Sequence, residues 1–287
     1  MNIFKFVPLL LLTTFLMGSS FAVVKIGLPY SSPLLLSALR FLLAGVIMAL
    51  VVIVLKRPHP TTKKDWLKIF TIGTFQTAGV MGCIFLSLRT ITASESSILT
   101  FMNPLLVVIF ATIFLKVRYR VYQWGGVVLG IIGVVITMGA QIEFKIGIVY
   151  GILSAVFWAT ATLLAKKWGV FFDTWVLSAY QMLFGGLLLL LGSITLEEPF
   201  FIVNSHSIFI LLWLSILSSI VQFAVWYYLL QKSDPGKTSA FLFLAPFFGV
   251  LTGWQLLDEP LYPSLLVGGL FIIMGIFLVN RNSQSKK

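Results

Sequence analysis

Long apolar runs recur along the whole chain, and each is long enough to cross a lipid bilayer. A helical span through the hydrocarbon core needs about 20 predominantly apolar residues. Hydrophobic residues form 59% of the 287 residues and charged residues only 10%. A soluble domain carries about 25% charged residues and cannot bury so much apolar surface. The sequence therefore predicts an all-α integral membrane protein without a separate soluble domain.

Ten apolar runs lie between polar or turn-forming segments, which contain prolines, glycines and short charged clusters. The predicted transmembrane helices cover residues 6–28, 33–55, 66–88, 95–115, 121–140, 146–165, 174–195, 207–230, 237–256 and 262–280. The first run follows Lys5 and has the layout of a signal peptide. We expect it to remain as a helix, because the second half of the chain contains its counterpart.

The chain contains an internal repeat. A shift of 142 residues places Pro104 on Pro246, and in the first two helices a shift of 141 places Arg40 on Gln181. Each repeat then holds five predicted helices. Because five is an odd number, the second repeat begins on the other side of the membrane, so the two repeats are inverted. The predicted repeats are residues 1–142 and 143–287.

The net charge of +11 comes from basic residues in short clusters between the apolar runs. They form no continuous basic stripe, so we expect no nucleic-acid partner. Cytoplasmic loops are rich in Lys and Arg, and most of the 20 basic residues fall on one side if both termini are cytoplasmic. The turn with Lys116 and Arg118 corresponds to the acidic turn with Asp258 and Glu259, as inversion predicts. We expect a multi-pass protein of a bacterial inner membrane.

Several short motifs recur along the chain: Gly18–Phe21 with Lys25, Ala38–Phe41, Ser94–Leu99 with Asn103-Pro104, Phe157–Ala159, Lys237–Ala240 with Ala245-Pro246, and Leu256–Pro260. These motifs are similar to those of EamA-type transporters of the drug/metabolite transporter superfamily. The resemblance covers nearly the whole chain and implies ten helices in two inverted halves; many such proteins export amino acids or other metabolites. Two departures are Met17, where the family has tryptophan, and Lys116-Val117, where the first half often has an acidic turn.

Polar residues share one face of the predicted eighth helix. Ser215, Ser218, Ser219, Gln222 and Trp226 follow at three- and four-residue steps. Polar groups are costly against lipid, so this face should point into the bundle. Two interpretations stay open: close helix packing by small hydroxyl residues, or a substrate pocket. Mid-depth polar and aromatic residues from both halves predict that pocket, lined by Gln76, Asn103, Trp158, Gln181, Gln222 and Trp226.

Trp158 and Arg40 are unusual for their depth in the predicted helices. Trp158 lies too deep for an interfacial anchor, so it either stacks on a substrate or fills the core. An intramembrane arginine costs about 2.5–3.5 kcal/mol on insertion scales, so Arg40 either binds a substrate carboxylate or pairs with Glu95. Pro104 and Pro246 fall at equivalent places within helices, where they form either static kinks or the hinges of a gate.

The residue inventory excludes several function classes. His59 and His206 fall in predicted loops, Cys83 is the only cysteine, and no nucleophile–base pair or metal-binding spacing occurs. We therefore expect no enzyme activity, metal or cofactor. The function predicted is secondary transport, the export of small organic metabolites such as amino acids by alternating access. A passive channel, a receptor, an importer and a drug exporter remain as alternatives, and the sequence specifies no oligomeric state.

Overall fold

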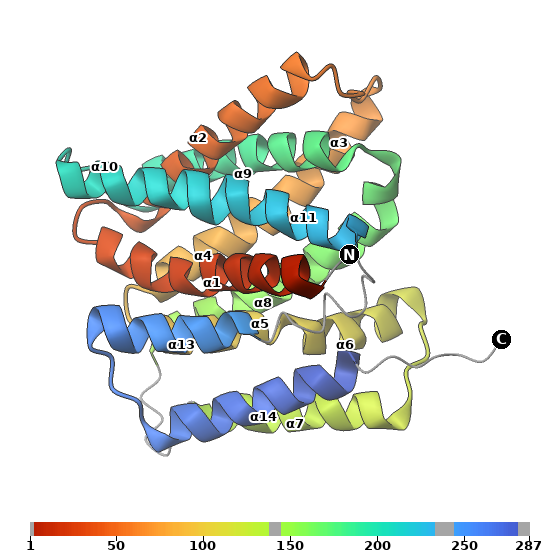
Figure 1. Cartoon of the computed structure of the whole chain (residues 1–287), viewed down its shortest axis with the longest axis vertical. Helices are drawn as coiled ribbons and strands as arrows, with labels where there is room; N and C mark the ends of the chain where they lie inside the picture. Colours follow the sequence, from red (N-terminus) through yellow and green to blue (C-terminus); the bar gives the residue numbers. More distant parts are fainter. Residues whose placement is uncertain (1–2, 138–144, 233–243, 281–287) are drawn as a thin grey trace.

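The computed structural model describes residues 3–137, 145–232 and 244–280 (Figure 1). Within these ranges the chain is helical apart from short connecting segments, and its β structure is one isolated bridge between Ser31 and Phe201. The predicted all-α class is therefore confirmed. The predicted repeat boundary between residues 142 and 143, and the start of the helix predicted at 237–256, lie outside the described residues.

Seven helical stretches of the described chain are long and apolar enough to cross a membrane. Four are single helices: α1 (Ile3–Gly27), α2 (Pro33–Val54), α8 (Ile146–Trp168, extended by the 3₁₀ turn η2, Gly169–Phe171) and α9 (Thr174–Leu196). Three are composite: α3–η1–α4 (Lys63–Gly73, Thr74–Gly79, Val80–Ser87), α5–α6 (Ala93–Phe101, Asn103–Leu115) and α10–η3–α11 (Ser205–Leu212, Trp213–Val221, Gln222–Lys232). Three further apolar helices are shorter: α7 (Val121–Thr137), α13 (Leu244–Leu257) and α14 (Pro263–Asn280).

The helices begin where the sequence supplies caps. At the start of α5 the Glu95 N–H donates to Thr92 Oγ1 at 3.0 Å, and the Thr92 N–H donates to the Glu95 carboxylate at 2.8 Å. This capping box satisfies backbone donors that have no partner inside the helix. Asn204 and Ser207 form a second capping box at α10. Pro33 lies in the first turn of α2, where its missing N–H removes no helical hydrogen bond.

Three of the long stretches change their helical geometry near the middle. The segments η1 and η3 are π-helical, and a shift of 142 places Thr74–Gly79 on residues 216–221, inside η3. The third break is at Met102, between α5 and α6. Pro104 therefore stands in the first turn of α6 and does not kink a continuous helix. Pro246 lies in the first described turn of α13, so its surroundings on the N-terminal side are outside the described residues.

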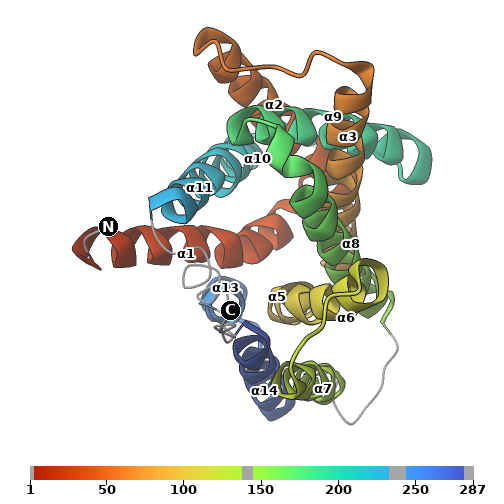
Figure 2. The same ribbon diagram turned by 90° about the vertical axis from the view of Figure 1, so that its right-hand side faces the viewer.

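The helices lie side by side in a bundle (Figure 1). Along the longest axis, α2 packs against α9 near one edge and α7 packs against α14 at the other edge. Between them, α1 contacts α11 and α13, and α8 contacts α4, α5 and α6. Figure 2 shows α1 and α11 across from α8. The described chain begins in α1 and ends in α14 at the same end of the bundle, here called the terminal end, and the other is called the opposite end.

Glycines allow the backbones of α7 and α14 to approach closely. A methyl group at Gly133 would lie 2.6 Å from the carbonyl oxygen of Gly268, and one at Gly126 would lie 2.7 Å from that of Gly275. Small residues at such crossings are typical of membrane helices, because lipid provides no hydrophobic force that brings helices together. The contact of α7 with α14 therefore depends on the absence of side chains at these positions.

Gly133→Ala is expected to lower stability. Its Cβ would overlap the α14 backbone, and overpacking of this kind costs about 1–3 kcal/mol. The matched control is Gly125→Ala on the same helix, where a Cβ meets nothing within 4 Å. In thermal unfolding of the detergent-purified proteins, the midpoint of Gly133→Ala should lie below that of the wild type. The midpoint of Gly125→Ala should equal that of the wild type. Equal midpoints for the two variants would mean that this helix contact is not tightly packed.

Candidate functional site

A cavity of about 540 Å³ lies in the middle of the bundle, among α1, α6, α8, α9, α11 and the composite α3–η1–α4. Six residues on its wall are those that the sequence predicts for a substrate pocket: Gln76, Asn103, Trp158, Gln181, Gln222 and Trp226. Pro104, predicted as a hinge, is also on this wall, whereas Arg40 and Pro246 are not. The structure thus gathers six separated residues around one space. Binding of a substrate by these residues stays a prediction.

Both halves of the chain contribute equivalent positions to the cavity wall. Met17 and Trp158 correspond under the shift of 141 residues, and Met81 and Phe223 correspond under the shift of 142. All four side chains line the cavity. The cavity therefore lies where the predicted repeats face each other.

Amide side chains provide the hydrogen-bonding groups of the cavity. The side-chain oxygen Oε1 of Gln181 accepts a hydrogen bond from Thr77 Oγ1 at 3.0 Å, which orients this amide. Asn103 Nδ2 donates to the carbonyl oxygen of Thr100 at 3.4 Å, across the break between α5 and α6. The remaining wall is mainly aliphatic, aromatic and thioether. Pockets with an apolar wall, a few placed polar groups and a volume of about 300–1,000 Å³ are typical small-molecule sites.

The described residues on the cavity wall carry no charge. No group of three His, Cys, Asp or Glu side chains in the described ranges is placed to hold a metal ion. His59 lies between α2 and α3, and His206 lies in the first turn of α10, stacked on the Tyr30 ring, not in the loop predicted for it. A ligand in the cavity would therefore be recognised by amides and rings.

The cavity wall extends towards the terminal end. Tyr119 precedes α7 at that end, while Thr162 lies near the end of α8 and Val279 near the end of α14; all three line the cavity. Burial raises the pKa of the Tyr119 phenol above its ordinary value, so this hydroxyl stays protonated and can donate a hydrogen bond. A solute entering from the terminal end would meet this group.

Packed aromatic rings cover the cavity on the side of the opposite end. The Trp158 and Phe101 rings have centroids 5.4 Å apart, and Phe101 lies 5.9 Å from Phe21. Phe21 and Phe101 are both buried. Tilted ring pairs at such distances are favourable beyond their buried area. The three rings come from α1, α5 and α8, so they close the cavity by joining helices from both halves.

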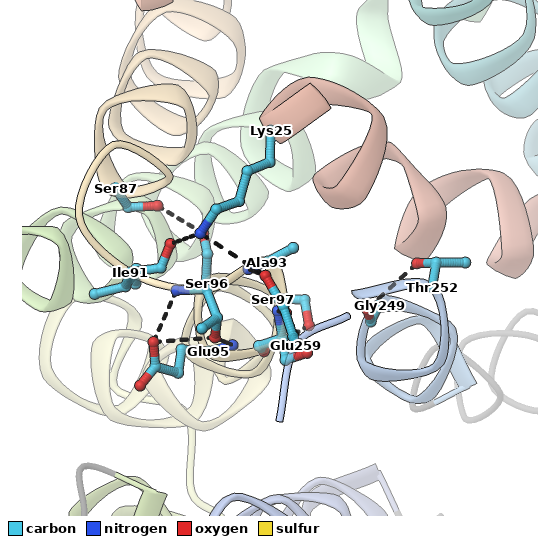
Figure 3. Close-up of polar contacts among 12 residues, drawn as sticks. Lys25, Ser87, Ile91, Ala93, Glu95, Ser96, Ser97, Gly249, Thr252 and Glu259 are labelled. Carbon is cyan, nitrogen blue, oxygen red and sulfur yellow. Dashed lines mark hydrogen bonds and ion pairs between the residues drawn. The ribbon is translucent and has the colours of Figure 1, made fainter. Parts of the chain in front are cut away.

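Beyond these rings, Glu259 joins three segments at the opposite end (Figure 3). Its carboxylate accepts hydrogen bonds from the backbone N–H groups of Ala93 at 2.6 Å and Ser94 at 3.0 Å, and from the Ser94 hydroxyl at 2.7 Å. It also lies 3.7 Å from Lys25 Nζ, which donates to the carbonyl oxygen of Ile91 at 2.5 Å. Glu259 is only 6% exposed. This Glu259 clasp connects the segment after α13 to the end of α1 and the start of α5.

A second clasp lies at the same end. The Glu197 carboxylate, which follows α9, accepts hydrogen bonds from the N–H groups of Leu34 at 3.2 Å and Leu35 at 2.9 Å. Next to it, the Ser32 N–H donates to the carbonyl oxygen of Phe200 at 3.1 Å. In both clasps a carboxylate from the second half caps a first-half helix, where backbone donors and the helix dipole favour negative charge. The Glu197 clasp therefore ties α9 to α2.

The pairing of Arg40 with Glu95 that the sequence suggested is wrong. The Glu95 carboxylate caps α5 through Thr92, while the Arg40 guanidinium contacts η3. Sequence reasoning also missed the clasps, because Glu197 and Glu259 appear in the sequence as residues of polar turns. Their distance from α2 and α5 along the chain conceals the contact. The available signals were that each lies two or three residues after a predicted helix and that Glu259 belongs to the Leu256–Pro260 motif.

Arg40 is buried beside the cavity, on α2. Its Nε donates to Ser219 Oγ at 2.9 Å, and its Nη2 donates to the carbonyl oxygen of Ser218 at 2.9 Å. The guanidinium also lies over the Phe41 ring, 4.8 Å from the centroid. Its polar partners are thus neutral oxygens of the π-helical η3. No ion pair of Arg40 occurs among the described residues.

Membrane-length apolar helices around a central cavity define a multi-pass α-helical membrane protein. A family profile then matches the chain twice, over residues 5–139 and 145–281, and the chain belongs to the EamA-like transporter family. It is similar to the uncharacterized transporter YvbV of Bacillus subtilis, with 29% identity covering 94% of this chain and 90% of that protein. An uncharacterized transporter of Archaeoglobus fulgidus is 29% identical, and the match covers 96% of this chain and 99% of that protein.

Two further similarities extend the comparison. Protein PecM of Dickeya dadantii is 25% identical over 91% of this chain and 88% of that protein. One solved crystal structure matches with a TM-score of 0.66 at 21% identity, covering 94% of both chains. At that identity the match concerns the fold alone. The relatives span nearly the same length as this chain, so the family assignment applies to all of it.

Proposed function

We propose that the protein is a secondary transporter that exports small organic metabolites, such as amino acids, by alternating access. The observation that carries the proposal is the cavity with no charged residue on its described wall, which is bordered by residues of the terminal end and covered from the opposite end by aromatic rings. Two clasps tie helices together at that opposite end. Alternating access requires a site that is reached from one side at a time.

Ten spans in two inverted repeats provide the machinery for this cycle. The two profile matches, each covering about half of the chain, support the division at residues 142 and 143. Helix contacts support it too: α2 packs on its equivalent α9, and α7 on its equivalent α14. In the proposed cycle the halves rock against each other, the clasps open, and the cavity closes towards the terminal end. The breaks at η1, η3 and Met102 lie beside the cavity, where they would let helix segments move separately.

A channel or a receptor would need different features. A passive pore would need a continuous polar path through the bundle. Here buried aromatic rings and the Glu259 clasp lie between the cavity and the opposite end. Import and drug export would use the same cavity, and the transport test below separates them from metabolite export. The amides and rings of the wall fit small solutes with both polar and apolar parts.

The test compares the culture medium of cells overexpressing the wild type or Trp158→Ala by untargeted mass spectrometry. A metabolite enriched outside only with the wild type would establish export and identify the substrate class. If no metabolite differs, uptake into proteoliposomes decides between an importer and a protein that moves no solute. The last result would reject the proposed function.

The proposed orientation places both termini in the cytoplasm of a bacterial cell. We expect single cysteines at positions 60 and 284, in a Cys83→Ser background, to react with an impermeant thiol reagent only from the cytoplasmic side. Position 60 lies between α2 and α3, and position 284 lies outside the described residues. Labelling of either cysteine in intact cells would reverse the orientation and, with it, the side on which the cavity opens.

A further inference from the structure

Two buried polar side chains of α2 each lack one kind of partner among the described residues: Arg40 lacks a counter-ion and Ser37 a hydrogen-bond partner. Arg40 is 3% exposed and has only neutral hydrogen-bond acceptors among the described residues. Ser37, one helical turn earlier, is fully buried, and its Oγ has no hydrogen-bond partner in the part of the chain that the structure describes. A buried hydroxyl without a partner and a buried charge without a counter-ion are both costly. Such groups in a membrane helix usually have a function.

Their repeat equivalents already line the cavity. A shift of 141 residues places Ser37 on Ser178 and Arg40 on Gln181. Ser178 and Gln181 are both on the cavity wall, whereas Ser37 and Arg40 are not. The hydrogen bonds join equivalent positions as well. Thr77 Oγ1 donates to Gln181 Oε1 at 3.0 Å, and at the equivalent positions Arg40 Nε donates to Ser219 Oγ at 2.9 Å. The two half-sites therefore share one architecture but differ in access and in charge.

We propose that Ser37 and Arg40 form a subsite for an anionic group of the substrate, exposed when the cavity opens to the opposite end. This inference rests on the proposed alternating access. In an inverted repeat, the two halves exchange conformations between the two open states. The environment that Ser178 and Gln181 have in this structure then passes to Ser37 and Arg40.

The chemistry of the subsite selects an anion. A guanidinium held beside serine oxygens in a low-dielectric interior attracts a carboxylate or a phosphate much more strongly than it would in water. The Ser37 hydroxyl, which has no other partner within the described ranges, can donate a further hydrogen bond to that anion. The neutral Gln181 amide binds the same group more weakly from the terminal end. A substrate carrying an anionic group would therefore be held in both states by different partners.

Matched cysteines test the access. In a Cys83→Ser background, Ser37→Cys and Ser178→Cys are compared in right-side-out and inverted vesicles, with thiosulfonate reagents of similar size and opposite charge. We expect Ser178→Cys to react from the terminal end and Ser37→Cys from the opposite end. The ratio of the labelling rate of the anionic reagent to that of the cationic reagent should be on the order of tenfold higher at Ser37→Cys than at Ser178→Cys. Arg40→Gln, which reproduces the residue at position 181, should remove this preference, and Arg40→Lys should keep it.

The outcomes separate this inference from the proposed function. Reaction of Ser37→Cys from the terminal end only, no reaction, or no charge preference overturns the subsite, while transport by the wild type still upholds the transporter. An unreactive Ser178→Cys together with absent transport rejects both. If propionate slows the thiosulfonate labelling of Ser37→Cys and propionamide does not, the subsite binds a carboxylate. If inorganic phosphate slows this labelling, the subsite binds a phosphate.

Discussion

Alanine in place of Trp158 is expected to lower the initial transport rate at least tenfold. The indole lines the cavity and packs at a tilt against Phe101, so its removal takes away a face for the substrate and loosens the aromatic cover. A loss of about 1.4 kcal/mol of interaction with the substrate in the rate-limiting state already lowers the rate tenfold. Gln181→Ala should reduce transport less, because it removes one amide and leaves the cover intact.

Transport into or out of proteoliposomes, with the metabolite found in the export test, measures these effects. Trp124→Ala is the matched control, because this tryptophan lies on α7 with 38% of its surface exposed and is not on the cavity wall. The control should transport at the wild-type rate. If Trp158→Ala and Gln181→Ala also transport normally at normal expression, the pocket is wrongly placed.

Glu259→Gln is expected to open the opposite end of the bundle. The substitution removes the charge that faces Lys25 and weakens the caps on Ala93 and Ser94. Hydrogen bonds to a charged group contribute about 1.5–3 kcal/mol each, so the ratio of open to closed forms should rise on the order of tenfold to a hundredfold. Glu259→Ala should act in the same direction, with greater loss of stability.

A cysteine at Ser97 provides the readout, because this residue is fully buried on α5 next to the clasp. Its labelling from the opposite end should accelerate at least tenfold with Glu259→Gln. Glu198→Gln changes an exposed glutamate at the same end and should leave the rate unchanged. Equal labelling in all three proteins would show that the Glu259 clasp does not hold this end closed.

Apolar length and caps made most helices predictable from the sequence. The helix predicted at 33–55 is observed at Pro33–Val54, and that predicted at 174–195 at Thr174–Leu196. The π-helical segments η1 and η3 were not predicted, because their hydrogen-bond register depends on packing with other helices. The sequence places Pro104 inside one helix, 95–115, as a kink or a hinge, whereas the chain departs from the helix at Met102, two residues earlier.

The cavity residues could be proposed because depth, helix face and repeat equivalence are all readable from sequence. Gln76 and Gln222, for example, stand out as polar residues within apolar helices, and both line the cavity. The clasps could not be predicted, because Glu259 and Ala93 are 166 residues apart and belong to different halves. Arg40 shows the same limit: its depth was evident, but its serine partners depend on how α2 crosses η3.

The two carboxylate clasps make the ends of the bundle chemically unequal. The repeat equivalents of Glu197 and Glu259 are Lys56 and Val117, so a carrier closed at the terminal end would lack both carboxylates. The empty carrier should therefore rest with its cavity turned to the terminal end. When the competent form is only a fraction of the population, apparent affinity falls by that fraction. If the proposed alternating access holds, the same solute would half-saturate the carrier at a lower concentration on the terminal face than on the other.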